Sequence, residues 1–268
     1  MKQLADDLRA EGEELNVLLA TLSEDDWRRP TPFKDWTVEA VMQHLLVGDW
    51  MNALALTDPY KFSATLERRN VARAAGEKVS GLEFMDHDPG AGDALRASWH
   101  QGQVALCDLF AVREPKARMQ WVGPDMSVRS GATARLMETW AHGQDIYDLL
   151  RQSRAPTDRL RNIATLGVNT YGWTFHNRGE DTPGPAPHVR LTAPSGATWT
   201  WNEPSETSLV EGAALEFCQV VTQGRNIADV DLTLVGEEAE KWMSIAQCFA
   251  GVPETPPQPG HRVWHQDL

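Results

Sequence analysis

The feature that most constrains this fold is a change in hydrophobic periodicity near residues 151–158. Before it, apolar residues recur at the helical spacing; Leu4, Leu8 and Leu15, for example, follow one another with acidic residues between them. After it, short stretches of alternating apolar and polar residues are separated by turn residues. The change predicts two domains of different classes.

The first domain, residues 1–152, is predicted to be a four-helix bundle. Its helices cover about residues 2–22, 37–56, 91–111 and 131–151. Asp35 or Thr37 can cap the second helix, and the loop "WVGPDMS" precedes the fourth. The connection of residues 57–90, which contains Pro59, is long enough to cover a site. Four helices of this length with at least one long connection are typical of a bundle.

The second domain, residues 157–252, is predicted to be a small α+β domain. A helix over residues 157–177 precedes strands in "HVRLTAP", "TWTWN" and "SLVEG". A helix in "AALEFCQVVTQ", a strand in "VDLTLVG" and a helix in "EEAEKWMSIAQCFAG" follow. Strands mixed with helices in this order favour an α+β domain over a second bundle. The Pro-rich tail, residues 253–268, is predicted to be extended.

Charge and cysteine content argue against several classes of function. Lys and Arg number 25 against 38 Asp and Glu, so the net charge of −13 repels nucleic acid and anionic lipid. No apolar run is long enough for a membrane span, and the N-terminus resembles an acidic amphipathic helix rather than a signal peptide. We expect a cytoplasmic protein. Homodimerisation is left open. Cys107, Cys218 and Cys248 lie far apart without CxxC spacing, which predicts buried thiols rather than disulfides or thiolate metal ligands.

Glu138 and His142, in "ARLMETWAHGQDIYDLL", are the first candidates for a chemical role. They lie four residues apart on a predicted helix, so their side chains point the same way. The same spacing is common on solvated helix faces, so a metal site needs a third ligand from elsewhere. His44 shares a helix face with Val41 and Gly48, which directs its imidazole toward the bundle interior. It is either that third ligand or a satisfied core histidine.

Two imidazoles and one carboxylate leave coordination positions open on a divalent ion, which is typical of a catalytic site. Asp145, one turn beyond His142, is either an acceptor for an imidazole N–H or a solvated acid. His87 and His100 could reach the site, although "HDPG" is first of all a turn sequence. The remaining histidines are expected at exposed positions: His176, His188, His261 and His265.

Other sequence features are less specific. Trp36, Trp50 and Trp140 lie near the candidate ligands and could belong either to the core or to a pocket lining. The sequence contains no G-x-S-x-G elbow, no phosphate-binding glycine loop and no dinucleotide fingerprint. Nucleophilic-serine and nucleotide chemistry therefore have no support.

The stretches "DWTVEAVMQHL" and "ARLMETWAHGQDI" resemble the DinB-like metal-binding proteins, in particular the actinobacterial branch with mycothiol-dependent maleylpyruvate isomerases. The resemblance covers the whole chain and implies a DinB-like four-helix bundle followed by a small, sterol-carrier-like α+β domain. It also implies a divalent ion, usually zinc, held by a His after "W-T-x6-H" and by an "E-x3-H" pair. These positions correspond to His44, Glu138 and His142.

The resemblance further implies that an Arg in a "G-R" step of the second domain faces the site. "TQGRNIADVDLTLVG" places Arg225 there, although a surface charge at a helix end is the alternative reading. Arg225, and Arg135 less directly, would then hold an acidic group of the substrate or cofactor.

Two classes of function follow. In the first, the metal lowers the pKa of a thiol cofactor such as mycothiol, and the thiolate attacks a small electrophilic substrate in an isomerisation or S-transfer; metal-bound hydroxide acting as a hydrolase is the variant on the same site. In the second, the protein is a non-catalytic binder of a small apolar ligand. An open coordination position favours the first class, and a fourth protein ligand favours the second.

Overall fold

The computed structural model describes residues 1–123 and 125–262, and it divides into two compact units. The first is Met1–Gly143, and the second begins at Gln144. The division falls inside one helix, Val128–Leu150, and therefore before the sequence-predicted boundary at residues 152–157. The predicted domain limits stay a prediction, and the tail beyond residue 262 lies outside the described residues.

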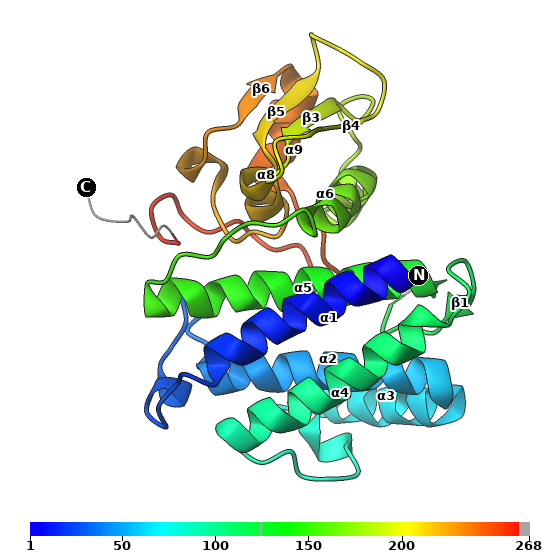
Figure 1. Ribbon diagram of the computed structural model, residues 1–268. Coiled ribbons are helices and arrows are strands. Elements are labelled where there is room, and N and C mark those ends of the chain that lie inside the picture. Colours follow the sequence, from blue (N-terminus) through cyan, green and yellow to red (C-terminus); the bar gives the residue numbers. More distant parts are fainter. Residues whose placement is uncertain (124, 263–268) are drawn as a thin grey trace. The chain divides into compact units, whose positions relative to one another are not determined.

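The first unit is helical. Its α-helices are α1 (Lys2–Leu19), α2 (Val38–Thr57), α3 (Pro59–Ala74), α4 (Asp93–Ala111) and α5 (Val128–Leu150), with short 3-10 helices at Asp26–Arg28 and Leu82–Phe84. Helix α4 lies beside both α1 and α2 (Figure 1). The four predicted helices correspond to α1, α2, α4 and α5.

Helix α2 starts at the residue expected from the sequence, and a tight turn precedes it. The hydroxyl of Thr37 accepts a hydrogen bond from the amide of Ala40 at 3.1 Å, so Thr37 is the N-cap. Just before it, Lys34 and Asp35 both adopt left-handed backbone conformations, with φ of 51° and 57°. The amide of Thr31 closes the turn by donating to the Trp36 carbonyl at 2.7 Å.

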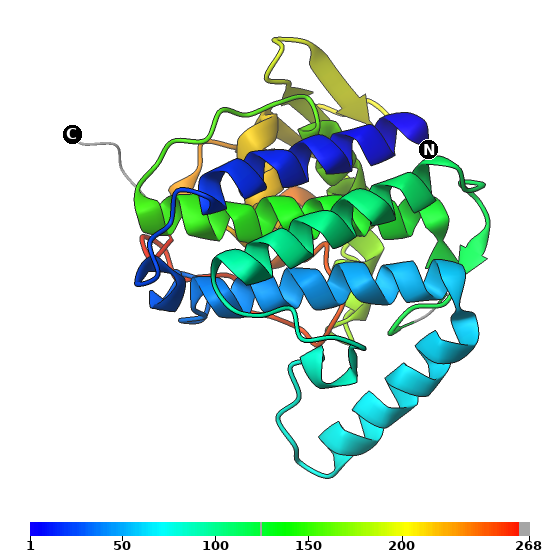
Figure 2. The same cartoon turned by 60° about the horizontal axis from the view of Figure 1, so that its bottom comes forward.

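The predicted connection of residues 57–90 is partly wrong, because it contains α3. Pro59 occupies the first turn of this helix, where its missing N–H costs nothing, and the side chain of Asp58 caps the amide of Lys61 at 2.9 Å. The proline therefore starts a helix rather than only ending one. Only Phe62 and Thr65 of α3 are buried, and Figure 2 shows α3 inclined away from the other helices of its unit.

The connection between α4 and α5 corrects the expectation of an all-α first half. It contains two strands, β1 (Arg118–Met119) and β2 (Met126–Ser127), which pair antiparallel. Such short pairing leaves no hydrophobic periodicity in the sequence. Pro124 of the predicted loop lies outside the described residues.

The second unit contains a two-layer α+β fold. After the end of α5 its elements are α6 (Leu160–Asn169), α7 (Tyr171–His176), β3 (His188–Thr192), β4 (Thr198–Trp201), β5 (Leu209–Ala213), α8 (Ala214–Val221), a 3-10 helix (Ile227–Asp229), β6 (Thr233–Val235) and α9 (Glu237–Ile245). The sheet order is β4-β3-β5-β6, with β3 and β5 parallel and the other two pairs antiparallel. All four predicted strands are present, and the helix predicted over residues 157–177 is split into α6 and α7 at Thr170.

Apolar and polar residues alternate along the strands, which directs the apolar side chains into the core of the second unit. Val189 and Leu191 of β3 are buried, while Arg190 between them forms an ion pair with Glu211 of β5 at 2.7 Å. Phe217 of α8 is also fully buried. The fold class predicted from the sequence, a helical bundle followed by a small α+β domain, is confirmed. None of the helices in the described part of the chain is both long and apolar enough to span a membrane.

Candidate metal centre

The structure brings together the three side chains that the sequence singled out. Nε2 of His44, on α2, lies 3.0 Å from Oε2 of Glu138, on α5, and Nε2 of His142 lies 3.5 Å from the same oxygen. One potential ligand atom from each residue lies within 4.8 Å of the others. Within residues 1–123 and 125–262, this is the cluster of His, Cys, Asp or Glu side chains whose spacing suits a metal ion.

Local sequence explains how the cluster forms. Glu138 and His142 are one turn apart on α5, so they present donors to the same side. The Thr37 cap fixes where α2 begins and hence the angular position of His44, seven residues later. The cluster is accessible on one side, because the His44 side chain is 39% exposed while that of His142 is 10% exposed.

Two aromatic rings from the turn before α2 line the cluster. The Phe33 ring meets the His142 imidazole edge to face at 4.9 Å, and the Trp36 indole lies nearly parallel to it, at 6.3 Å. Trp36 is half-buried, so it lines the site rather than filling the core, whereas Trp140 is a core residue. Phe33 was not identified from the sequence, because nothing in its neighbourhood distinguishes it from an ordinary loop aromatic.

The electrostatics of the cluster favour the protonation states that bind metals. Burial lowers the pKa of His44 despite its hydrogen bond to Glu138, which favours the neutral imidazole. Burial alone would raise the pKa of Glu138, but hydrogen bonds from His142 and His44 outweigh it, so that pKa lies well below its usual value. A neutral imidazole and a carboxylate are the forms that act as ligands.

The donor set fits a divalent ion of the zinc type. Ligands at the usual zinc distances in a tetrahedral shell lie about 3.3 Å from one another, so small side-chain adjustments would bring these three donors into position. Two imidazoles and a carboxylate are a common set for zinc sites with an open position. The cluster is therefore chemically suited to hold an ion and to leave room for another ligand.

Asp145 and Arg225, both in the second unit, are buried rather than solvated. Asp145 is 2% exposed and pairs with Arg262, which is inconsistent with the solvated-acid alternative. Nη1 and Nη2 of Arg225 donate to the two carboxylate oxygens of Asp148 at 2.7 and 2.8 Å. Arg225 is 8% exposed, so it is not a surface charge at a helix end. Asp148 was not identified from the sequence, because only tertiary structure reveals its partner.

Arg135 is buried and pairs with an acid of its own unit. Its Nε donates to Asp49 at 2.8 Å and its Nη2 to the carbonyl of Leu45 at 3.1 Å, and the side chain is 3% exposed. Asp49 could have been identified, because it lies within the largely apolar run "LLVGDWM" of a helix, where a buried acid requires a partner.

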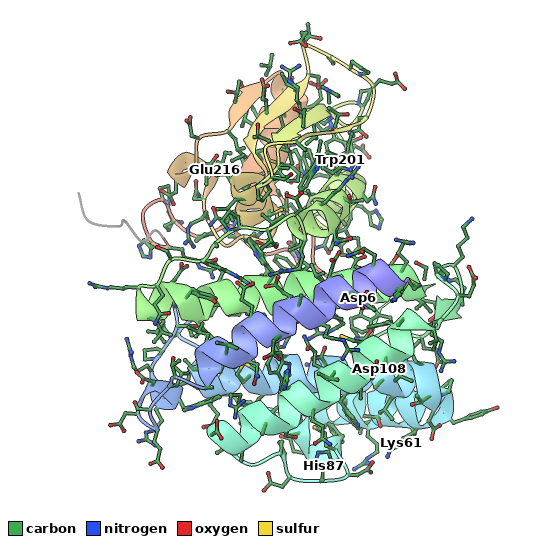
Figure 3. All side chains as sticks on the ribbon, in the orientation of Figure 1. Asp6, Lys61, His87, Asp108, Trp201 and Glu216 are labelled. Atoms are coloured by element: carbon green, nitrogen blue, oxygen red, sulfur yellow. The ribbon has the colours of Figure 1, made fainter. Side chains whose placement is uncertain are left out.

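The other histidines take no part in the cluster. His87 is exposed on the connection before α4 (Figure 3), and His100 pairs with Glu13 at 2.8 Å. The expectation for His188 is wrong, because it is buried on β3 and its Nδ1 lies 3.0 Å from the Trp201 carbonyl oxygen. His176 and His261 are exposed as expected, and His265 lies outside the described residues.

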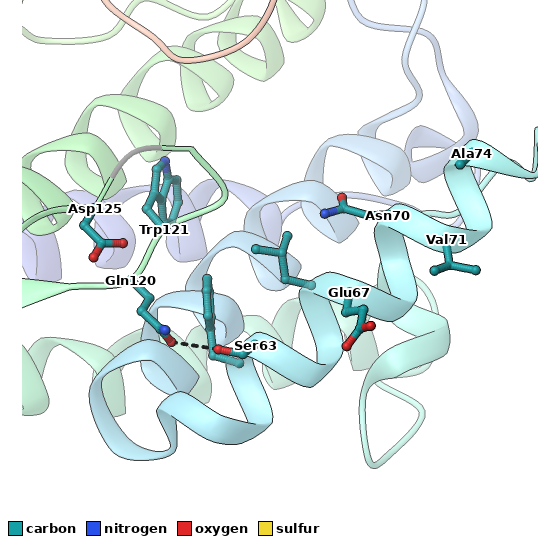
Figure 4. Close-up of a pocket in the computed structure, with 10 residues that line it drawn as sticks. Ser63, Glu67, Asn70, Val71, Ala74, Gln120, Trp121 and Asp125 are labelled. Atoms are coloured by element: carbon teal, nitrogen blue, oxygen red, sulfur yellow. Dashed lines mark hydrogen bonds between the residues drawn. The ribbon is translucent and has the colours of Figure 1, made fainter.

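A separate open groove of about 520 Å³ runs along α3 (Figure 4). It is lined on one side by Ser63 and Glu67 and on the other by Gln120 and Trp121. None of the three candidate metal ligands lines it, so it does not contribute to the cluster.

The three thiols are buried, as predicted. Burial raises the pKa of Cys107 to about 12 and that of Cys218 well above its usual value. Neither forms a thiolate near neutral pH, and thiolates are the nucleophilic form.

Comparisons with known proteins agree with the helical unit. The model of the mycothiol maleylpyruvate isomerase N-terminal domain matches residues 8–147, more than half of the chain. Uncharacterized proteins from two strains of Mycobacterium tuberculosis are each 39% identical over 248 residues, which cover 92% of this chain and 95% of theirs.

Two solved structures were also matched. The crystal structure of a mycothiol-dependent maleylpyruvate isomerase aligns with a TM-score of 0.49 at 13% identity, over 81% of this chain and 87% of that one. A histidine-to-alanine mutant of such an isomerase aligns with a TM-score of 0.48 at 16% identity, over the same shares. The family assignment rests on the sequence matches: the chain belongs to the family of the mycothiol maleylpyruvate isomerase N-terminal domain.

Proposed function

We propose that this protein is a metal-dependent enzyme that uses a low-molecular-weight thiol, mycothiol, to isomerise a small electrophilic substrate or, as an S-transferase, to join the intact thiol to it. The observation that carries the proposal is the cluster of His44, Glu138 and His142. All three lie inside the segment matched by a family that is named after mycothiol chemistry.

In this proposal, His44, Glu138 and His142 hold one zinc ion. A bound divalent ion would supply Lewis acidity, which lowers the pKa of a thiol or water bound beside it. Phe33 and Trp36 exclude water from the His142 side of the cluster by covering its imidazole. His44, on the more exposed side, leaves the approach for the thiol and substrate.

The nucleophile comes from outside the chain. Cys107 and Cys218 are fully buried, and their raised pKa values keep them protonated. Cys248 is also buried. A free thiol cofactor, or water in its place, is therefore required.

Arg225 is proposed to hold an acidic group of the substrate or cofactor. Both Nη atoms donate to Asp148. The Nε–H of the same guanidinium is the donor proposed to bind the acidic group. Arg225→Lys should raise KM for an anionic substrate at least tenfold with a smaller change in kcat, since lysine lacks the planar fork. Equal kinetic constants in both proteins would contradict this role.

The first experiment measures metal stoichiometry on purified protein. Wild type should contain close to one zinc per chain, and His44→Ala should lose it while remaining folded by circular dichroism. The matched control is His100→Ala, which removes a histidine from the same unit that lies outside the cluster. Full zinc occupancy in His44→Ala would refute the ligand assignment.

The second experiment identifies the nucleophile. Cobalt-substituted protein is titrated with mycothiol, glutathione and coenzyme A, and a sulfur-to-cobalt charge-transfer band in the ultraviolet is expected with mycothiol. No band with any thiol would favour hydrolysis by metal-bound hydroxide, and an unreactive protein with a closed metal shell would favour the binding-protein alternative. A cytoplasmic location and a homodimer remain part of the proposal, and fractionation and light scattering test them.

A further inference from the structure

A second polar bridge joins α2 to α5 one helical turn from the candidate ligands. Arg135 donates from Nε to Oδ1 of Asp49 at 2.8 Å and from Nη2 to the Leu45 carbonyl at 3.1 Å. The other carboxylate oxygen of Asp49 accepts from the Trp99 indole at 3.0 Å. Asp49 and Arg135 are 2% and 3% exposed, so the bridge is shielded from water.

The bridge has a defined register with the metal cluster. His44 lies opposite Glu138, Gly48 lies against the Arg135 guanidinium, and Asn52 lies against Gly131. Numbers rise along α2 as they fall along α5, so the two helices run antiparallel at this interface. Arg135 shares a face of α5 with Glu138 and His142, which follow it by three and seven residues.

Gly48 provides the space that the guanidinium occupies. A β-carbon at Gly48 would lie 2.5 Å from Nη1, 2.7 Å from Cζ and 2.9 Å from Nη2 of Arg135. These separations are too short for any real contact. Glycine at this position therefore lets Arg135 approach the α2 backbone and reach the Leu45 carbonyl, next to His44.

A buried ion pair of this kind contributes little net stability compared with apolar residues of the same volume, because both charges must be desolvated. It does penalise any displacement that separates the charges, and fixing register is the best-attested use of such pairs. A metal site needs that register, because its ligands come from two helices and tolerate errors of only about 0.5 Å.

We propose that Arg135 is a positioning residue, which with Asp49, Gly48 and the Leu45 carbonyl fixes the axial register of α2 against α5. This register keeps His44 within ligand distance of Glu138 and His142. The inference rests on the proposed metal function, and it assigns to Arg135 a role different from the substrate contact expected from the sequence.

The first test replaces the pair with apolar residues. The double variant Asp49→Leu/Arg135→Met should stay folded but bind zinc about 10- to 100-fold more weakly in chelator competition, and its cobalt spectrum should change. A double variant of the exposed α1–α4 ion pair, Arg9→Met/Asp108→Leu, is the control and should keep the wild-type affinity. Arg135→Lys retains the charge opposite Asp49 and should restore part of the affinity.

The second test leaves every charge in place. Gly48→Ala should displace the guanidinium and weaken zinc binding, whereas Gly102→Ala on α4, where a β-carbon meets nothing within 4 Å, should not. Wild-type affinity and spectrum in both Gly48→Ala and the folded double variant would overturn the proposal.

Failure of the two proposals is distinguishable. If the wild type binds no zinc, the proposed function fails, and a crystal structure of the metal-free double variant still decides the positioning role. We expect the His44 Nε2 to Glu138 Oε2 distance to lengthen from 3.0 Å beyond hydrogen-bonding range. An unchanged distance would refute Arg135 as a positioning residue.

Discussion

Two helix interfaces of the first unit, α1–α4 and α2–α5, differ in the residues that they bury. The α1–α4 interface buries apolar side chains such as Leu15 and Leu106, together with one neutral hydrogen bond from Gln103 to the Leu8 carbonyl at 3.3 Å. Its Arg9–Asp108 ion pair lies on the surface. The α2–α5 interface buries an ion pair and carries the histidine–glutamate cluster. Sliding the helices would break a neutral hydrogen bond in the first interface and would separate paired charges in the second.

Apolar and charged contacts have different roles in these two interfaces. Apolar burial stabilises in proportion to area and tolerates small shifts. Buried polar groups are costly unless each partner is in place, so they specify one arrangement rather than adding to its stability. We infer that the buried charges of α2–α5, rather than its apolar contacts, set the geometry of the site.

The largest expected effect on folding is at α1–α4. Leu8→Ala should lower the free energy of unfolding by about 2–5 kcal/mol, because Leu8 is fully buried and its loss leaves a cavity. Urea denaturation measures the change. Val17→Ala on the same helix, at a position that is 59% exposed, should change it by less than about 0.5 kcal/mol. Similar losses from both variants would contradict apolar burial at Leu8 as the source of the stability.

The next largest effect is the stabilisation of the α2–α5 interface by bound zinc. Zinc at 100 times its dissociation constant should stabilise the wild type by about 2.7 kcal/mol and His44→Ala hardly at all. Thermal unfolding with and without zinc measures both. Without zinc the two proteins should unfold within about 1 kcal/mol of each other, because the His44 side chain is 39% exposed. Equal stabilisation of both by zinc would place the ion elsewhere.

A smaller effect is expected from pH. Burial lowers the pKa of His44 from 6.5, so the unfolded chain takes up the proton first as pH falls. The metal-free protein should therefore lose stability as pH falls below 6.5, and Glu138 should add to the loss below 4.5 because its pKa is also lowered. His44→Ala should flatten the upper part of this profile, and His87→Ala should not. A wild-type profile that is flat below pH 6.5 would contradict the assignment.

The last prediction is that Cys107 does not react with thiol reagents in the native state. Cys107, fully buried at the α4 side of the apolar interface, has its pKa raised to about 12, so a thiol reagent at pH 8 should not label it in the native state. All three cysteines should react in denaturant. Rapid native labelling, followed by mass spectrometry, would show that the α1–α4 interface opens more readily than its burial indicates.

Local signals in the sequence identified much of the fold. Periodicity located α1, α2, α4 and α5, and alternation located the four strands of the second unit. Local signals are ambiguous where one residue serves two elements: Pro59 both ends one helix and begins the next, so the sequence predicts a connection where α3 lies. Sequence also does not predict the burial of His188, because histidine occurs at both buried and exposed positions of strands.

In the candidate site, residue spacing alone indicates which side chains could act together. Helical spacing places Glu138 and His142 on one face and His44 on the face shared with Gly48, since the side-chain direction in a helix is fixed by residue number. The partners of the charged residues depend on how the helices and loops pack: Asp49 pairs with Arg135, and Asp148 pairs with Arg225. The members of each pair are far apart in the chain, and no local spacing encodes their pairing.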